Sequence, residues 1–164
     1  MKTRTTRLWL AVLLMGAAVA SAGADFSGTW VLDKARSEGL PEGIDQTMTV
    51  KQAGDRVEVE TRMTGPMGEQ TIPDLYVLDG KETDFTPPVI GGGGGKGRRT
   101  ARWTADGNGF ESTEQATLDG PEGKAEIKGA RKWTLAGDGR TLTIEMTLTT
   151  SQGDVRTRRI FARK

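Results

Sequence analysis

The sequence predicts an all-β protein, an antiparallel up-and-down β-barrel of about eight to ten strands. The first observation behind this prediction is composition: 23 of the 164 residues are glycine and only 35% are hydrophobic, which is typical of short strands joined by many turns. The second is the alternation of apolar and polar residues along several segments. The third is the regular spacing of glycine-containing turns, with no helical period between them. The length suits one domain with one hydrophobic core.

Residues 1–22 have the features of a secretory signal peptide. Three basic residues lie at the start, residues 8–20 form an apolar run of 13 residues, and Ala20-Ser21-Ala22 is a small-x-small cleavage site. The run is shorter than the roughly 20 residues that span a membrane, so a retained anchor is the less favoured alternative. We expect a secreted or periplasmic protein with no membrane span after removal of the signal. The chain has no cysteine, which excludes a lipoprotein signal and disulfides.

Net charge does not indicate a polyanion-binding protein. Beyond residue 22 the chain carries 20 basic and 22 acidic residues. The charge is uneven, with 6 basic and 13 acidic residues at positions 25–95 but 14 basic and 9 acidic residues at positions 96–164. Either the strands mix these charges over one surface, or a basic face meets an anionic ligand or an envelope surface.

The first predicted strand lies within residues 25–33. Its alternation places Gly28, Trp30 and Leu32 on one face, where a large aromatic side chain can close one end of a barrel. The stretch Phe26-Ser27-Gly28-Thr29-Trp30-Val31-Leu32-Asp33, followed by Arg36-Ser37, resembles the opening of small secreted bacterial lipocalin-like proteins. Its Gly-x-Trp is similar to the first-strand signature of lipocalins and avidins.

This resemblance implies a lipocalin-like, calycin-type barrel over residues 25–164. In such barrels a late-strand arginine packs near the first-strand tryptophan, a role that the resemblance gives to Arg159 beside Trp30. The chain lacks the Thr-Asp-Tyr loop motif of lipocalins, so no lipocalin ligand or receptor chemistry is carried over.

The next segments are predicted to form hairpins. Residues 37–45 lack an apolar period and predict a loop, at the place where a lid would cross the barrel mouth. Pro73 suits an edge strand, and Asp79-Gly80 is a hairpin signal. Gly91 to Gly97 does not fit a phosphate-binding loop and predicts a disordered hairpin loop. The expected strands lie at residues 46–52, 56–63, 71–78 and 82–88, and then at 98–104, 110–118, 124–135, 141–149 and 154–162.

Three charged residues fall on faces that are predicted to point into the barrel. Glu114 alternates with Phe110 and Ala116, Arg131 shares a face with Trp133, and Arg159 shares one with Phe161. Because buried charges need partners, either Glu114 pairs with Arg131 or Arg159, or a ligand supplies an anion, or the register is different. Two cations against one acid favour an anionic or carboxylate-bearing ligand. The candidate ligand-binding residues are Trp30, Glu114, Arg131, Trp133 and Arg159.

The absence of histidine and cysteine excludes the common catalytic and metal-binding arrangements. We therefore expect no catalytic residues, no metal and no cofactor, and the few aromatic residues do not favour nucleic-acid binding. Two functions remain. The first is a monomeric, non-enzymatic carrier that binds a small hydrophobic or carboxylate-bearing ligand in the barrel. The alternative is a packed-barrel structural or interaction protein of the cell envelope with no ligand. A cavity above about 300 Å³ favours the carrier.

Overall fold

The computed structural model describes residues 23–66, 68–87, 94–120 and 123–164. The predicted signal peptide lies outside the described residues. Within them, no helix is both long and apolar enough to cross a membrane.

The described residues form ten strands and one turn of 3₁₀-helix, η1 (Lys34–Arg36). The strands are β1 (Gly28–Leu32), β2 (Asp45–Ala53), β3 (Arg56–Gly65), β4 (Gly68–Val77), β5 (Asp79–Phe85), β6 (Gly94–Trp103), β7 (Gly109–Gly120), β8 (Gly123–Leu135), β9 (Thr141–Thr150) and β10 (Gly153–Arg163).

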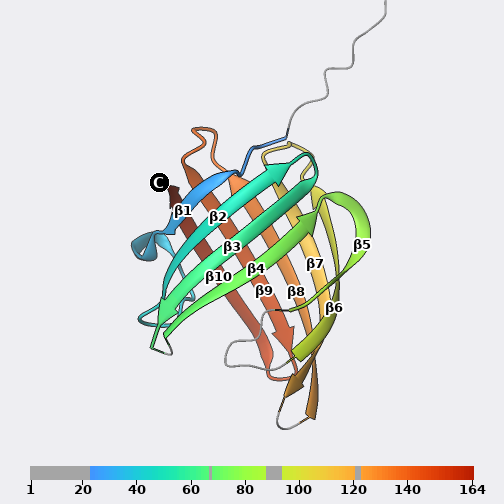
Figure 1. Cartoon of the computed structure of the whole chain (residues 1–164). Helices are drawn as coiled ribbons and strands as arrows, with labels where there is room; N and C mark the ends of the chain where they lie inside the picture. The colour runs from blue at the N-terminus through green and yellow to red at the C-terminus, as the bar shows by residue number, and fades with distance from the viewer. Residues whose placement is uncertain (1–22, 67, 88–93, 121–122) are drawn as a thin grey trace, which may run out of the picture.

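All ten strands belong to one antiparallel sheet that curls into a nearly closed barrel (Figure 1). The hydrogen-bonded order is β4-β3-β2-β1-β10-β9-β8-β7-β6-β5, so consecutive strands pair except β4 and β5, and the first strand pairs with the last. At that junction Leu32 pairs with Phe161, and the Asp33 N–H donates to the Ile160 carbonyl at 2.8 Å. The predicted fold class is therefore confirmed.

The barrel has one seam without backbone pairing, between β4 and β5. The hairpin predicted at Asp79-Gly80 is wrong, because β5 bends away from β4 and pairs only with β6 (Figure 1). Leu78, between the two strands, donates its N–H to the carbonyl of Asp55 in the β2–β3 turn instead. Pro73 lies in β4 at this edge of the sheet, as predicted.

The glycine-rich segment is partly a strand, which corrects the prediction of a disordered loop for Gly91 to Gly97. Gly94 to Gly97 belong to β6, where Phe85 of β5 pairs with Gly97. The Phe85 ring occupies the space of a side chain at position 97, and a Cβ at position 95 would lie 2.7 Å from Pro87 Cγ. Glycine is needed here because neighbouring side chains cover the backbone closely. Residues 91–93 lie outside the described residues.

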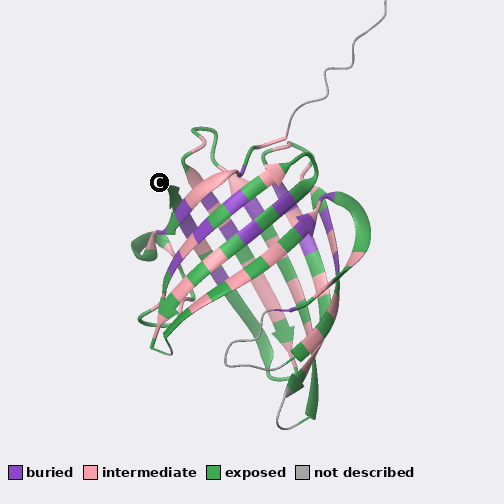
Figure 2. Ribbon diagram, in the orientation of Figure 1, coloured by how far each residue is buried: buried purple, intermediate pink, exposed green. Residues whose placement is uncertain are grey.

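The hydrophobic core fills one half of the barrel, the upper half in Figure 2. Its centre is an aromatic cluster with ring centroids 5.0–6.2 Å apart, formed by Phe26, Tyr76, Phe110 and Trp133. Trp30 and Leu32 are buried beside it, whereas Val31 on the opposite face of β1 is 40% exposed. The alternation predicted for the first strand is therefore confirmed.

The loop after η1 lies along the side of the barrel. Glu38 forms an isolated bridge with Arg158 of β10, with backbone hydrogen bonds of 2.8 and 3.1 Å. This part of the predicted loop therefore lies against a strand, which corrects the expectation that it crosses the barrel mouth as a lid.

Candidate functional site

A cluster of charged side chains lies inside the barrel, below the aromatic core. Its centre is Arg99 of β6, whose side chain is fully buried. The guanidinium donates to both carboxylate oxygens of Asp74 at 2.6 and 3.1 Å, to Glu114 Oε1 at 2.9 Å and to the Leu75 carbonyl at 2.7 Å. Since Asp74 and Leu75 belong to β4, Arg99 joins the two sides of the unpaired seam.

Two aromatic rings cover the Arg99 guanidinium. Its Cζ lies 4.2 Å from the ring centroid of Tyr76 and 4.3 Å from that of Phe85. Such contacts are strongest where water is excluded. Phe85 therefore has two roles, covering Arg99 and filling the space above Gly97.

Arg131 of β8 completes the charged cluster. It donates to the Tyr76 hydroxyl at 2.6 Å and to Asp74 Oδ2 at 3.2 Å, and it lies 3.4 Å from Glu114 Oε2. Of the alternatives left open for Glu114, the structure shows pairing with Arg131. We call Asp74, Tyr76, Arg99, Glu114 and Arg131 the ion cluster; its two cations balance its two acids.

Burial and the neighbouring groups act on the pKa values of this cluster in opposite directions. Burial lowers the pKa of Arg131, but Tyr76 and the carboxylates of Glu114 and Asp74 outweigh it and raise that pKa above its ordinary value. Burial raises the pKa of the Tyr76 hydroxyl. Arg131 therefore stays charged and donates, and Tyr76 stays a neutral phenol whose oxygen accepts from Arg131.

Sequence reasoning missed Asp74 and Arg99, although a signal was present. Asp74 alternates with Ile72 and Tyr76, and Arg99 alternates with Ala101, so each shares the inward face of its strand. The same-face rule that identified Glu114 would have identified both. With Asp74 and Arg99 included, the described part of the barrel interior holds two acids and three arginines. Arg99 and Arg131 pair with the two acids, so Arg159 carries the remaining positive charge.

Arg159 does not pack against Trp30, which corrects the role implied by the resemblance. The register between β1 and β10 pairs Trp30 with Arg163, and the Arg163 Cζ lies 4.4 Å from a Trp30 ring centroid. Arg163 also lies against Gly28, where a Cβ would be 3.2 Å from its Nη1. Arg159 lies further along β10, where it donates to Gln46 Oε1 at 3.3 Å.

The barrel interior contains a cavity of about 110 Å³ between β2, β3, β4, β8, β9 and β10. Of the predicted ligand-binding residues, Arg131, Trp133 and Arg159 line it. Glu114 belongs to the ion cluster instead, and Trp30 is fully buried, with its Nε1 donating to the Phe26 carbonyl at 2.8 Å. The remaining wall consists of Gln46, Met48, Val59, Thr61, Met63, Ile72, Asp74, Tyr76, Ile144, Met146 and Phe161.

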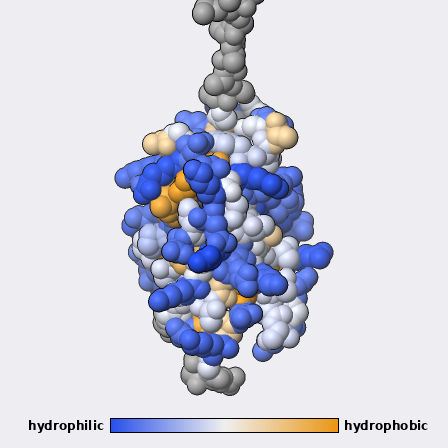
Figure 3. Space-filling view, turned by 90° about the vertical axis from the view of Figure 1, so that its right-hand side faces the viewer, coloured by the Kyte–Doolittle hydropathy of each residue, from blue (hydrophilic) through white to orange (hydrophobic). Residues whose placement is uncertain are grey.

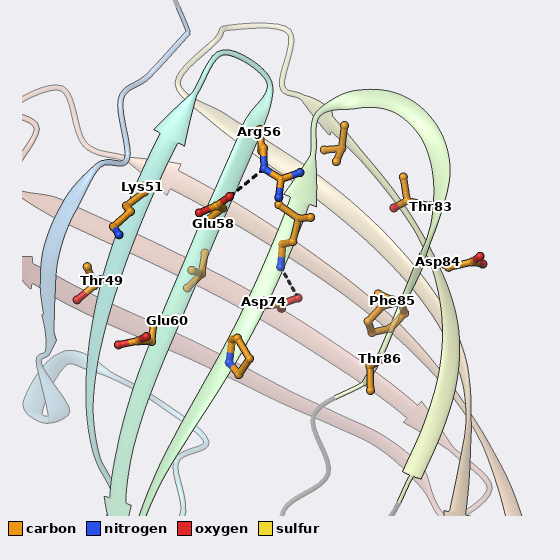
Figure 4. A pocket seen from close by; sticks show the side chains of 14 residues that line it. Thr49, Lys51, Arg56, Glu58, Glu60, Asp74, Thr83, Asp84, Phe85 and Thr86 are labelled. Atoms are coloured by element: carbon orange, nitrogen blue, oxygen red, sulfur yellow. Dashed lines mark hydrogen bonds and ion pairs between the residues drawn. The ribbon is translucent and has the colours of Figure 1, made fainter.

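A larger hollow of about 580 Å³ lies outside the barrel, over the seam between β4 and β5 (Figure 4). Its polar rim carries charges of both signs, and Arg56 pairs there with Glu58 at 2.9 Å. The apolar residues in its wall are Val59, Pro73, Leu75, Val77 and Phe85. The side of the barrel seen in Figure 3 is mostly hydrophilic, with hydrophobic atoms in small patches.

The exposed edge of β4 is poorly suited to pairing with another strand. Pro73 has no N–H to donate, the Leu75 N–H donates to Asp74 Oδ1 at 2.9 Å, and the Leu75 carbonyl accepts from Arg99. The seam is therefore held by side chains. In the part of the chain that the structure describes, no group of three or more acidic side chains is arranged to hold a metal ion.

No protein-family model matches the chain, and no curated protein matches its sequence. The fold is similar to a solved structure of zebrafish ileal bile acid-binding protein in complex with cholic acid. The TM-score is 0.53 at 17% sequence identity, and the match covers 85% of this chain and 98% of the zebrafish chain. At this identity, the similarity shows a shared barrel fold.

Proposed function

We propose that the protein is an exported, non-enzymatic binding protein that holds a small hydrophobic or carboxylate-bearing ligand inside its barrel. The observation that carries this proposal is the interior cavity. Most of its wall is apolar, and a few polar groups face it from Gln46, Arg131 and Arg159. This combination is typical of small-molecule sites, where apolar walls give affinity and a few polar groups fix orientation.

The size of the cavity sets a limit on the ligand. About 110 Å³ lies between the roughly 300 Å³ above which a carrier is favoured and the absence of a cavity in a fully packed barrel. It is also somewhat smaller than an engineered apolar cavity of about 150 Å³ that admits benzene. The interior therefore suits a compact ligand, and Met48, Met63 and Met146 in its wall have flexible side chains that can adapt to its shape.

The comparison with the zebrafish structure supports the binding of a small hydrophobic ligand, since that protein was solved with cholic acid. The composition supports the absence of enzymatic activity, because the chain has no histidine or cysteine. The arrangement of the two interior acids supports it as well, since Asp74 and Glu114 are both paired with arginine. The features of residues 1–22 support export to the periplasm or the medium. We further propose that the protein acts as a monomer without a cofactor.

A titration with a cavity-filling variant tests the proposal. We expect calorimetry with short-chain acids and alcohols to show saturable one-to-one binding to the wild type. Thr61 of β3 lines the interior cavity, whereas Thr49 of β2 lines the larger hollow outside the barrel. The Thr61→Phe variant should therefore lose binding and the Thr49→Phe variant should retain it. If none of the compounds binds the wild type, the proposal fails and the packed-barrel alternative is favoured.

A further inference from the structure

Arg159 is the interior cation without an acidic partner among the described residues. Each side chain in the ion cluster has an oppositely charged or hydroxyl partner within 3.4 Å. By contrast, the hydrogen bond that Arg159 makes is to the neutral amide oxygen of Gln46 at 3.3 Å. Its Nε is buried with no partner. Arg159 as a whole is half-buried, and a cation taken partly out of water without an anion destabilises a folded protein.

The other charged groups that face the cavity do not neutralise Arg159. Asp74 and Arg131 also line the cavity, but Asp74 is bound by Arg99 and Arg131. Burial, and then the positive charge of Arg131, lower the pKa of Arg159. The cavity wall therefore carries an unbalanced positive charge at the position of Arg159.

The unpartnered polar atoms of the cavity wall are hydrogen-bond donors. Besides Arg159 Nε, the Trp133 Nε1 is buried and has no partner in the described part of the chain. A guanidinium and an indole N–H can donate but cannot accept. A complementary ligand therefore has acceptor oxygens, and a negative charge where it meets Arg159.

We infer that the cavity, widened by movement of its methionine side chains, binds a compact monoanion, a short-chain aliphatic carboxylate of about six carbon atoms or fewer, with its carboxylate on Arg159. This inference rests on the proposed function and deepens it. The carboxylate accepts from the Arg159 guanidinium, and the apolar body lies against the methionines of β2, β3 and β9. Arg131 and Glu114 neutralise each other within the ion cluster and do not bind the charged end.

Matched ligands that differ in the head group test the charge preference. Calorimetry compares hexanoate, 1-hexanol and hexylamine on the wild type and on the Arg159→Met and Arg159→Lys variants. The wild type should bind hexanoate about tenfold more tightly than 1-hexanol, because the ligand forms a charge-assisted pair. It should bind hexylamine least. The Arg159→Met variant should lose the preference for hexanoate and still bind 1-hexanol, and Arg159→Lys should retain part of the preference.

The stability of the ligand-free protein gives a second readout. Replacing Arg159 by methionine removes a half-buried cation that has no acidic partner among the described residues, so the melting temperature should stay the same or rise. Replacing Arg131 by methionine removes a partner of Asp74 and Glu114, so the melting temperature should fall. A fall for Arg159→Met as large as that for Arg131→Met would show that Arg159 has a structural role, and it would overturn the inference.

The outcomes separate this inference from the proposed function. If hexanoate and 1-hexanol bind the wild type equally, or if Arg159→Met keeps the preference, the inference is wrong while the binding function stands. If dodecanoate binds more tightly than hexanoate, the inferred limit of about six carbon atoms on the ligand is wrong. If neither hexanoate, 1-hexanol nor dodecanoate binds, the proposed function itself fails. Should Arg159→Met not fold, Arg159→Gln provides the same comparison.

Discussion

Removing Arg99 should destabilise the barrel far more than removing its neighbour Arg98. Arg99 is fully buried and holds Asp74, Glu114 and the Leu75 carbonyl across the seam. The Arg99→Ala variant leaves two buried carboxylates without their main partner, and breaking a buried ion pair in this way costs about 3–5 kcal/mol. This is a large part of the roughly 5–15 kcal/mol by which domains are stable.

Arg98 is a matched control on the same strand. It points outward, and its partners Glu82 and Asp84 are exposed, with side-chain exposures of 55% and 94%. Exposed pairs of this kind contribute about 1 kcal/mol or less, so Arg98→Ala should have a small effect. Arg99→Lys should be intermediate, because one ammonium group cannot reproduce the forked contacts of a guanidinium.

Urea unfolding followed by tryptophan fluorescence measures these differences, since Trp30 and Trp133 are buried in the core. In a thermal melt, the loss for Arg99→Ala corresponds to a decrease in Tm of about 10–15 °C for a domain of this size. If Arg99→Ala lowers the free energy of unfolding no more than Arg98→Ala does, the seam does not depend on the ion cluster.

Three further predictions concern the closure of the barrel and its pH dependence. Gly97→Ala should lower the free energy of unfolding by about 1–3 kcal/mol, because the new Cβ meets the Phe85 ring. Gly137→Ala is the control and should change the urea midpoint little, since a Cβ there has no other atom within 4 Å. Equal midpoints for the two variants would contradict the packing of Phe85 over β6. Arg163→Ala should lower the free energy of unfolding by about 1–3 kcal/mol in the same urea assay, because it removes hydrogen bonds to Gly139 and Ser27 and the contact with Trp30. A decrease no larger than that for Arg98→Ala would refute this prediction. Hydrogen bonds from Ser27 lower the pKa of Asp25 below 3.8 in the folded protein. The ionised carboxylate therefore stabilises the fold above that pH, and this stabilisation is lost as the pH falls through the lower pKa of the folded state. Asp25→Asn should make the decrease in stability below about pH 4 less steep, and an unchanged slope would exclude this role of Asp25.

Much of the barrel follows from local sequence patterns. The alternation around Trp30 and the regular turns predict a meander that closes on its last strand, because each hairpin is specified by residues close together in the chain. The seam between β4 and β5 could not be predicted in this way. It depends on the contact of Arg99 with Asp74, residues from strands that are not paired with each other.

The glycines of β6 show the same limit. A run of glycines predicts disorder when it is considered alone, but Phe85 and Pro87 cover this run from the neighbouring strand and its extension. The alternation pattern placed Arg159 inside the barrel without showing which residue would lie beside Trp30. That assignment depends on the register between β1 and β10, which places Arg163 there.

Binding inside the barrel can be observed directly by titrating hexanoate into the protein labelled with ¹³C in its methionine methyl groups. Met48, Met63 and Met146 line the interior cavity. The methyl resonances of these three residues should shift together and saturate at one equivalent, and the shifts should be lost in Thr61→Phe. Binding of hexanoate that leaves these three resonances unchanged would contradict the claim that the barrel interior is the binding site.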